Sequence, residues 1–372
     1  MAGKVTPLAN HHKARGARFT EFGGWQMPVQ YKGIIEEHLA VRRACGLFDL
    51  SHMGEIEIRG PLALDFAQGL MTNDVSKLAP GRVQYSLLCN ETGGIIDDLL
   101  VYRHPDYVTL AVNASNTDKD LDWLQRMAAR PPYRGKVEVL NVGERRAILA
   151  IQGPQAPKVM RSVGLDVLDL PYMAFRLLGQ NGEIMVSRTG YTGEIGYELY
   201  MPASDAVTWW ERFLGLANSV DIEPVGLGAR DTLRLEMGYT LYGNDIDETT
   251  TPWEAGIGWA VKLDKEFIGR TALLEAKAQG PQRRLVGFVV EGRGIARPGY
   301  PVYIEGELRG EVTSGCISPS SNRPVGLAYV DSAWAEAGTS IEILVRGRAV
   351  AGRITSVPFM PSRVRDAVTL GD

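Results

Sequence analysis

The feature of this sequence that most restricts its fold is a strand followed by a Gly-Pro turn and a helix, which occurs twice. In the first copy, residues 54–59 alternate in polarity, and Gly60-Pro61 precedes a helical pattern. In the second copy, residues 147–152 are almost all apolar, and Gly153-Pro154 precedes a helical pattern. Proline suits the first turn of a helix, where its missing N–H would have no partner. The pattern predicts two related α+β subdomains, against the alternative that such short units recur by chance.

Further strands follow each copy of this unit, and a helix containing tryptophan closes it. The strands are expected at 83–88, 95–102 and 107–112 in the first unit and at 174–179, 183–188 and 196–200 in the second. The closing helices are expected at 116–129 and 204–216, and other helices at 34–44 and within 224–238. Residues 1–20 are polar and are expected to be irregular.

The pattern changes at Gly280-Pro281, where a domain boundary is expected. Short apolar segments separated by glycine and proline follow, with strands expected at 285–290, 301–304, 311–314, 325–330, 340–345 and 349–357. Short strands between turn residues are typical of all-β domains. The sequence therefore predicts a small barrel or sandwich after this boundary.

Composition argues against several classes of protein. The 372 residues carry a net charge of −4, with 45% apolar and 23% charged residues, so neither nucleic acid nor an anionic membrane is expected as a partner. We expect no membrane span and no signal peptide, because the chain has no long apolar run. Cys45, Cys89 and Cys316 form no CxxC pair or zinc spacing, so we expect buried thiols in a reducing cytoplasm and no metal site.

Common nucleotide and hydrolase motifs are absent from the sequence. The chain has no G-x-x-x-x-G-K-[ST] phosphate loop and no G-x-S-x-G turn. The segment Gly226-Leu227-Gly228 lacks the third glycine of a dinucleotide fingerprint, and no HExxH motif occurs. Since these motifs are absent, the acidic residues within expected strands are the stronger indication of function.

Two adjacent aspartates, Asp97 and Asp98, lie in the middle of an expected strand that a Gly-Gly turn at 93–94 introduces. Because successive strand side chains point to opposite faces, one carboxyl group points each way. Asp97 is expected to share a face with Ile95, Leu99 and Val101, and Asp98 with Ile96, Leu100 and Tyr102. An unpaired carboxylate in apolar surroundings costs several kcal/mol, so at least one of the two should have a specific reason to be there. The alternative is an edge strand whose acids lie in water or pair with arginine.

Two further segments place charged residues beside glycine-rich or helical patterns. Glu198 lies in a strand after the glycine-rich segment 189–196. Arg230 and Arg234 lie one turn apart on one face of the following helix. Taken alone, these patterns are also compatible with a solvated strand face and with an ion-pair ladder on a helix surface.

Six segments together resemble the aminomethyltransferase family of the glycine cleavage system, the T-proteins. The segments are FDLSHM at 48–53, GIIDDL at 94–99, GYTGE at 190–194, ARDTLRLE at 229–236, LYGNDID at 241–247 and SGCISPS at 314–320. They occur in the family's order, and the resemblance extends from about residue 7 to residue 359. Because several independent motifs agree, the resemblance outweighs the structural alternatives given above.

The resemblance implies an α+β fold of three domains arranged as a cloverleaf around a central folate site. The first α+β domain is expected to comprise 1–53 and 144–222, the second 54–143 and 223–280, and the C-terminal β-barrel domain 281–372. The implied enzyme takes an aminomethyl group from the reduced lipoyl arm of a partner, the H-protein, and passes the carbon to tetrahydrofolate. The products are 5,10-methylenetetrahydrofolate, ammonia and dihydrolipoyl H-protein.

The resemblance also assigns roles to residues at matching positions. Asp98 matches the catalytic aspartate and would hold or relay a proton at the reacting nitrogens, which leaves Asp97 a structural residue. Glu198 matches the acid that binds the aminopyrimidine edge of the pterin through two parallel N–H bonds. Arg230 matches a second ligand-binding position. The expected pocket lining is Met53, Tyr85, Asn113, Tyr191 and Trp253.

The C-terminal tail departs from part of the family. Arg365 stands where some members carry a ligand-binding tyrosine, counted from Phe359. An arginine there would suit the glutamate tail of folate, and Arg363 is a competing candidate for the same role.

Three other functions are less compatible with the sequence. A folate-binding protein of iron–sulfur cluster assembly shares the fold, but its cysteine-containing KGCYxGQE motif is replaced here by RTGYTGE at 188–194. The folate domain of a dimethylglycine or sarcosine oxidoreductase is joined to a flavin domain, for which 372 residues leave no room. A pure folate-binding module does not require an acid at the reacting nitrogens, where the resemblance places Asp98.

Overall fold

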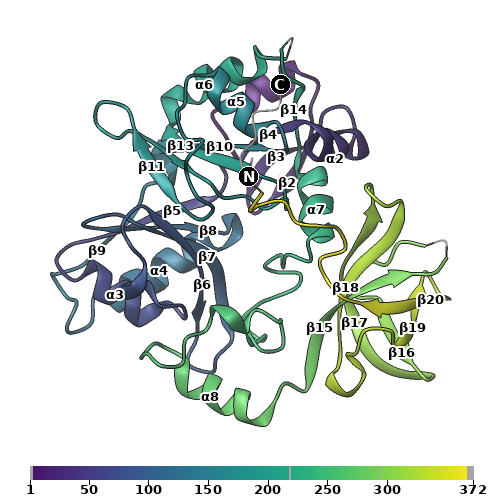
Figure 1. Cartoon of the computed structure of the whole chain (residues 1–372). Helices are drawn as coiled ribbons and strands as arrows, with labels where there is room; N and C mark the ends of the chain where they lie inside the picture. The colour runs from purple at the N-terminus through teal and green to yellow at the C-terminus, as the bar shows by residue number, and fades with distance from the viewer. Residues whose placement is uncertain (1–2, 218, 293, 367–372) are drawn as a thin grey trace.

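The computed structural model describes residues 3–217, 219–292 and 294–366. Figure 1 shows three lobes, of which one is a β-barrel at the right and two combine a sheet with helices. The predicted α+β fold class with a C-terminal barrel is confirmed by these sheets. The 3₁₀ helices are η1 (Val75–Lys77), η2 (Ala114–Asn116), η3 (Gly143–Arg145), η4 (Ala203–Asp205), η5 (Gly258–Ala260) and η6 (Ser332–Trp334).

The sheet that contains Asp98 has five strands in the order β6-β7-β8-β5-β9. Its strands are β5 (Gly54–Arg59), β6 (Arg82–Cys89), β7 (Ile95–Arg103), β8 (Val108–Val112) and β9 (Glu138–Asn141). Helices α3 (Ala63–Leu70) and α4 (Thr117–Ala128) bury their apolar faces on this sheet, with Phe66 and Trp123 in the shared core. An amphipathic helix of this kind is stabilised mainly by such burial.

The sheet that contains Glu198 has six strands in the order β11-β12-β13-β10-β4-β14. Its strands are β4 (Cys45–Asp49), β10 (Arg146–Gln152), β11 (Phe175–Leu178), β12 (Ile184–Ser187), β13 (Gly196–Pro202) and β14 (Ile222–Pro224). Helices α5 (Ala156–Ser162) and α6 (Ala206–Leu214) cover one face. Strand β10 lies between β13 and β4 as β5 lies between β8 and β9, so the two units share an arrangement.

The faces of the two sheets that helices leave free pack against each other. One buried cluster joins Tyr102 of β7 to Ile148 and Tyr200 of the other sheet. The hydroxyl groups of Tyr102 and Tyr200 are hydrogen-bonded at 2.7 Å. Asp98 and Glu198 lie on strands that contribute to this shared layer, so residues about one hundred positions apart in the sequence converge there.

The prediction that residues 1–20 are irregular is wrong. This part of the chain forms β1 (Lys4–Val5), α1 (Ala9–Ala14) and β2 (Arg18–Phe22), followed by β3 (Trp25–Gln30) and α2 (Ile34–Arg43). His12 of α1 is buried, with its Nε2 2.9 Å from Asp49 Oδ2 and its ring 4.9 Å from that of Trp210. A helix of six residues is too short to be stable alone, so these tertiary contacts hold it.

Helix α7 (Leu227–Glu236) follows β14 of the six-stranded sheet and packs against α2, β3 and the barrel strand β17. Arg234 is 2% exposed; its Nη1 lies 2.7 Å from Asp245 Oδ2, and its Nη2 donates to Ser314 Oγ at 2.8 Å. Arg234 is therefore part of a buried junction, and the surface ion-pair ladder does not describe it. Helix α8 (Arg270–Gln279) then leads to the barrel.

The C-terminal unit is a closed barrel in the order β15-β18-β17-β16-β19-β20, which resolves the choice between barrel and sandwich. Its strands are β15 (Arg283–Val290), β16 (Pro301–Ile304), β17 (Glu307–Ser318), β18 (Arg323–Asp331), β19 (Ser340–Val345) and β20 (Arg348–Thr355). The yellow tail in Figure 1 then returns from the barrel toward the six-stranded sheet, where Arg188 donates to the carbonyl groups of Val364 and Asp366.

The predicted domain boundaries, 1–53 with 144–222, 54–143 with 223–280, and 281–372, stay a prediction. Residues 1–2 and 367–372 at their outer ends lie outside the described residues. Across the described parts of the chain, no helix combines the length and apolar content that crossing a membrane requires.

Candidate functional site

The turn before β7 requires its two glycines. Gly93 has φ +84°, a backbone conformation that residues with a Cβ rarely adopt. A Cβ on Gly94 would lie 1.8 Å from the carbonyl oxygen of Glu248. The turn therefore brings the start of β7 against the loop that contains Glu248.

From Asp97 onward, the side chains of β7 alternate between the two faces of the sheet as predicted, so the two aspartates lie on opposite faces. Asp97 lies on the side of Leu99 and Val101, which belong to the core under α3 and α4. Asp98 lies on the side of Leu100 and Tyr102, which face the other sheet. The two residues at the start of β7 depart from the expected alternation: Ile95 packs in a separate cluster, and Ile96 joins the core under the helices. A register shift between Leu88 and Cys89 of β6 lies opposite this point.

Asp98 is partly exposed and is held by neutral donors. Tyr85 Oη donates to Asp98 Oδ2 at 3.0 Å, and Asn113 Nδ2 donates to Asp98 Oδ1 at 2.9 Å. Desolvation by burial and the neighbouring charge of Asp97 raise the pKa of Asp98 from 3.8 to about 7. An acid with such a pKa exchanges a proton readily at neutral pH, which suits general acid–base chemistry.

Glu198, on β13, is 7% exposed and is held by hydroxyl groups. Thr189 Oγ1 donates to Glu198 Oε2 at 2.5 Å, and Tyr200 Oη donates to the same oxygen at 3.3 Å. No hydrogen bond from another described residue reaches Glu198 Oε1. This oxygen retains its full capacity to accept a ligand N–H.

Arg230 lies on α7 with its guanidinium carbon 4.6 Å from the centre of the Tyr191 ring. Among the described residues no carboxylate forms an ion pair with it, although the charge of Glu198 acts on it. Burial lowers the pKa of Arg230. Tyr191 in turn donates from its hydroxyl to the carbonyl oxygen of Thr240. A partly buried cation without a carboxylate partner suits a ligand oxygen.

The remaining predicted lining residues lie at different places. Met53 packs against the apolar cluster between the sheets. Trp253 packs in the cluster under α8 with its indole N–H donated to Leu273 O at 2.9 Å. The structure thus joins Asp98 directly to Tyr85 and Asn113, whereas Trp253 contacts Leu273 and the cluster under α8, and its lining role stays a prediction.

The two tail arginines have different surroundings. Arg363 Nη1 lies 3.4 Å from Glu194 Oε2, and its backbone N–H donates to Gly193 O at 2.7 Å. Arg365 is exposed, and its guanidinium carbon lies 5.7 Å from the ring centre of Tyr172. Arg363 therefore lies beside a carboxylate of the chain, with which Arg42 also pairs at 2.9 Å, and Arg365, which forms no ion pair with another described residue, is the better candidate for an anionic ligand.

Sequence reasoning missed two residues beside this site. Trp259 of η5 is 60% exposed and stacks on Tyr85 with ring centres 5.3 Å apart. His52 is buried, its Nδ1 has no hydrogen-bond partner among the described residues, and burial and the charge of Arg230 lower its pKa to about 4. A signal for His52 existed in the segment 48–53, but Trp259 had none, because its stacking partner lies in a distant strand.

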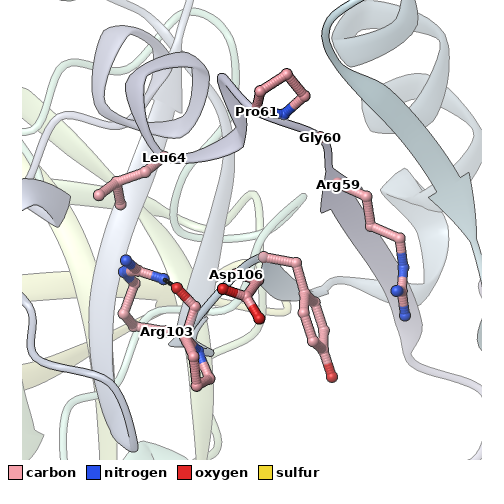
Figure 2. Close-up of a pocket in the computed structure, with 8 residues that line it drawn as sticks. Arg59, Gly60, Pro61, Leu64, Arg103 and Asp106 are labelled. Carbon is pink, nitrogen blue, oxygen red and sulfur yellow. Dashed lines mark hydrogen bonds between the residues drawn. The ribbon is translucent and has the colours of Figure 1, made fainter.

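A surface pocket of about 540 Å³ lies at the far end of β7, roughly 17 Å along the strand from Asp98. Figure 2 shows Arg59 and Arg103 on opposite sides of Asp106 in this pocket. Both arginines are engaged, Arg59 with Glu57 at 2.7 Å and Arg103 with backbone carbonyl groups. Separately, within the described ranges no group of three or more His, Cys, Asp or Glu side chains lies where it could hold a metal ion.

Comparisons with known proteins agree over the whole chain. The family model described as GCVT N-terminal domain matches residues 8–265, and that described as glycine cleavage T-protein C-terminal barrel domain matches residues 283–360. The aminomethyltransferase of Halothermothrix orenii is 50% identical over 362 residues, which are 96% of this chain and 100% of that protein. The aminomethyltransferase of Symbiobacterium thermophilum is 47% identical over 96% of this chain and 98% of its own length.

A solved structure shows the same architecture. The crystal structure of glycine cleavage system aminomethyltransferase T from Bartonella henselae superposes with a TM-score of 0.92 at 38% identity, covering 97% of this chain and 99% of that one. Fold and site thus define a one-carbon transferase whose cosubstrate is tetrahydrofolate. The chain belongs to the glycine cleavage T-protein family, the aminomethyltransferases.

Proposed function

We propose that this chain takes the aminomethyl group carried on the reduced lipoyl arm of an H-protein and transfers its carbon to tetrahydrofolate. The products would be 5,10-methylenetetrahydrofolate, ammonia and dihydrolipoyl H-protein. The family supports an aminomethyltransferase of glycine cleavage, and the choice of H-protein as partner is our inference from that family. Location in the cytoplasm stays a prediction, made from the three cysteines.

The observation that most supports the proposed chemistry is the environment of the Asp98 carboxyl group and its raised pKa. Among the described residues its carboxyl group is bound only by the neutral donors Tyr85 and Asn113, and its pKa is raised to about 7 by burial and by Asp97. Tetrahydrofolate supplies the nitrogen atoms that receive the carbon. Asp98 would accept the proton that leaves there and supply a proton to the departing amine, each contributing roughly 10²–10⁴-fold in rate.

The residues around Glu198 and Arg230 fit a pterin. Glu198 Oε1 is free to accept an N–H, and Glu198 Oε2 already accepts two hydroxyl groups, which fix the orientation of the carboxylate. The guanidinium of Arg230, which pairs with no carboxylate in the described part of the chain, would donate to a carbonyl oxygen of the same ring. We propose that these two residues bind and orient the pterin, while Arg365 binds its glutamate tail.

The direct test uses purified protein, aminomethyl-loaded H-protein and tetrahydrofolate. We expect ammonia and 5,10-methylenetetrahydrofolate to form in equal amounts, and free thiol to appear on the H-protein in the same amount. Free aminomethyl thiols without the H-protein should react much more slowly, because binding of the carrier positions the group. Tight folate binding without transfer would show that the chain is only a binding module.

A further inference from the structure

The loop at 188–195, between β12 and β13, contacts both residues that we propose to bind the pterin. Thr189 Oγ1 donates to Glu198 Oε2 at 2.5 Å. Two residues further on, the Tyr191 ring centre lies 4.6 Å from the guanidinium carbon of Arg230. The position of this one loop therefore affects Glu198 and Arg230 together.

Gln152 of β10 gives the loop a fixed shape. Its side chain is buried, with Nε2 donating to Thr189 O at 3.1 Å and Oε1 accepting from Thr192 Oγ1 at 2.9 Å. A Cβ on Gly190 would lie 2.1 Å from Gln152 Oε1, so the loop closes tightly around this amide. Because Gln152 binds the loop on both sides of Tyr191, a displacement at Thr192 would also move Tyr191.

Arg42 of α2 joins the far end of this loop to α7. Its Nη1 donates to Thr192 O at 2.6 Å and lies 2.9 Å from Glu194 Oε1. Its Nη2 lies 2.9 Å from the carboxylate of Glu236, the last residue of α7. A guanidinium has five N–H donors in a rigid fork and can hold two carboxylates at once. Arg42 thus connects the loop to the helix that carries Arg230.

This bridge is buried, which distinguishes it from a surface ion pair. The side chains of Arg42, Glu194 and Glu236 are 10%, 2% and 0% exposed. On the barrel side, Ser318 Oγ and Ser320 Oγ donate to Glu236 at 2.5 and 2.8 Å, so Glu236 is fixed in place. Without Arg42, two buried carboxylates would be left close together with like charge, which would push the loop away from α7.

Two other cations approach these acids, but neither replaces the bridge. His38 Nε2 lies 3.1 Å from Glu236 Oε2, and Arg363 Nη1 lies 3.4 Å from Glu194 Oε2. Within the described ranges, Arg42 is the residue that pairs with both acids.

We propose that Arg42 is a positioning residue for the pterin half of the site, which holds the loop at 188–195 against α7 so that Tyr191 and Arg230 keep a fixed spacing. Through Thr189, the same bridge keeps Glu198 in its orientation. The inference rests on the proposed binding of the pterin by Glu198 and Arg230. Arg42 itself acts through these residues and does not bind the ligand.

The first test compares tetrahydrofolate affinity and kcat in Arg42→Lys. Lysine keeps the positive charge but cannot hold both carboxylates, so calorimetry should show affinity lower by about fivefold or more. With aminomethyl-loaded H-protein and saturating tetrahydrofolate, kcat should change by less than about twofold, because Tyr85 and Asn113, which hold Asp98, lie outside the bridge. Full affinity in Arg42→Lys, or a loss confined to kcat, would overturn the proposal. The control is Arg43→Ala, an exposed neighbour on α2 that should bind folate normally.

Chemical rescue tests the fork directly. Arg42→Ala removes the whole guanidinium, and free guanidinium ion can pair with the two carboxylates that remain. Millimolar guanidinium chloride should restore much of the lost folate affinity, whereas the same concentration of sodium chloride should not. No rescue in a folded Arg42→Ala protein, or unchanged affinity before rescue, would contradict the bridge. If Arg42→Ala does not fold, Arg42→Lys decides the question.

A double-mutant cycle separates positioning from a general loss of stability. In an Arg230→Ala background, Arg42→Lys should lower affinity by less than about twofold, because Arg42 acts through the spacing to Arg230. Additive losses would show that Arg42 only stabilises the fold. Normal tetrahydrofolate binding by both Arg230→Ala and Glu198→Gln would instead refute the proposed pterin contacts, and this inference with them. If those two variants bind weakly while Arg42→Lys binds fully, the inference alone fails.

Discussion

Asp98 and Glu198 occupy strands of two related sheets, yet their surroundings differ in one decisive respect. Asp98 has a like charge beside it, from Asp97, and neutral donors on both oxygens. Glu198 has hydroxyl donors on one oxygen and the cation Arg230 within its electrostatic reach. A neighbouring negative charge favours the protonated acid, whereas a neighbouring cation favours the carboxylate. The comparison indicates that one acid is suited to moving a proton and the other to binding an N–H edge.

The largest expected effect is on turnover in Asp98→Asn. The variant keeps the size and most hydrogen bonds of the side chain but cannot exchange a proton, so we expect turnover to fall by at least about 100-fold. Folate affinity should change by less than about tenfold. Single-turnover kinetics with loaded H-protein and calorimetry with tetrahydrofolate measure the two quantities. Equal losses of turnover and of folate affinity would mean that Asp98 binds folate rather than reacts. Asp98 and Glu198 would then have the same role.

The next effect is on binding in Glu198→Gln. Replacing the free acceptor oxygen with a mixed amide leaves a ligand N–H poorly paired, which costs roughly 1–3 kcal/mol. Calorimetry should therefore show tetrahydrofolate affinity lower by about tenfold or more. The control is Glu138→Gln, because Glu138 is an exposed strand acid. Unchanged affinity in Glu198→Gln would remove Glu198 from the binding site.

A smaller effect is expected at the tail. Arg365→Ala removes a solvent-exposed cation, so affinity for folate carrying several glutamates should fall about two- to fivefold, as for an exposed ion pair. The loss should shrink at high salt. Arg363→Ala should leave affinity nearly unchanged, because Arg363 pairs with Glu194. The opposite ranking would assign the tail to Arg363.

The smallest effect concerns stability. Folded Asp98 keeps its proton up to about pH 7, whereas aspartate in an unfolded chain releases it near pH 4. Between these values the folded state binds more protons, so Asp98 makes the free energy of unfolding fall as pH rises. Asp98→Asn removes this loss and should raise the Tm by roughly 2–4 °C above pH 7, with little change below pH 4. A lower Tm for the variant at pH 8 would contradict the raised pKa.

Local patterns in the sequence determined a large part of the fold. Period-two alternation and Gly-Pro turns predicted β6, β7, β8 and most barrel strands close to their observed bounds, because these signals depend on neighbouring residues alone. The exception is β17 (Glu307–Ser318), which was expected only at 311–314. The same alternation placed Asp97 and Asp98 on opposite faces of β7. Local patterns did not predict α1, whose stability comes from contacts of His12 with Asp49 and Trp210.

What only the tertiary structure decided is which groups surround each acid. The sequence singled out Asp97, Asp98 and Glu198, but the hydrogen bonds from Asn113 to both aspartates require β8, which ends beside Asn113, to pair with β7. The stacking of Trp259 on Tyr85 likewise joins segments more than 170 residues apart. Local patterns act through a few residues of chain, whereas the pKa of a buried acid depends on every charge and dipole that the folded chain brings within several ångströms of it.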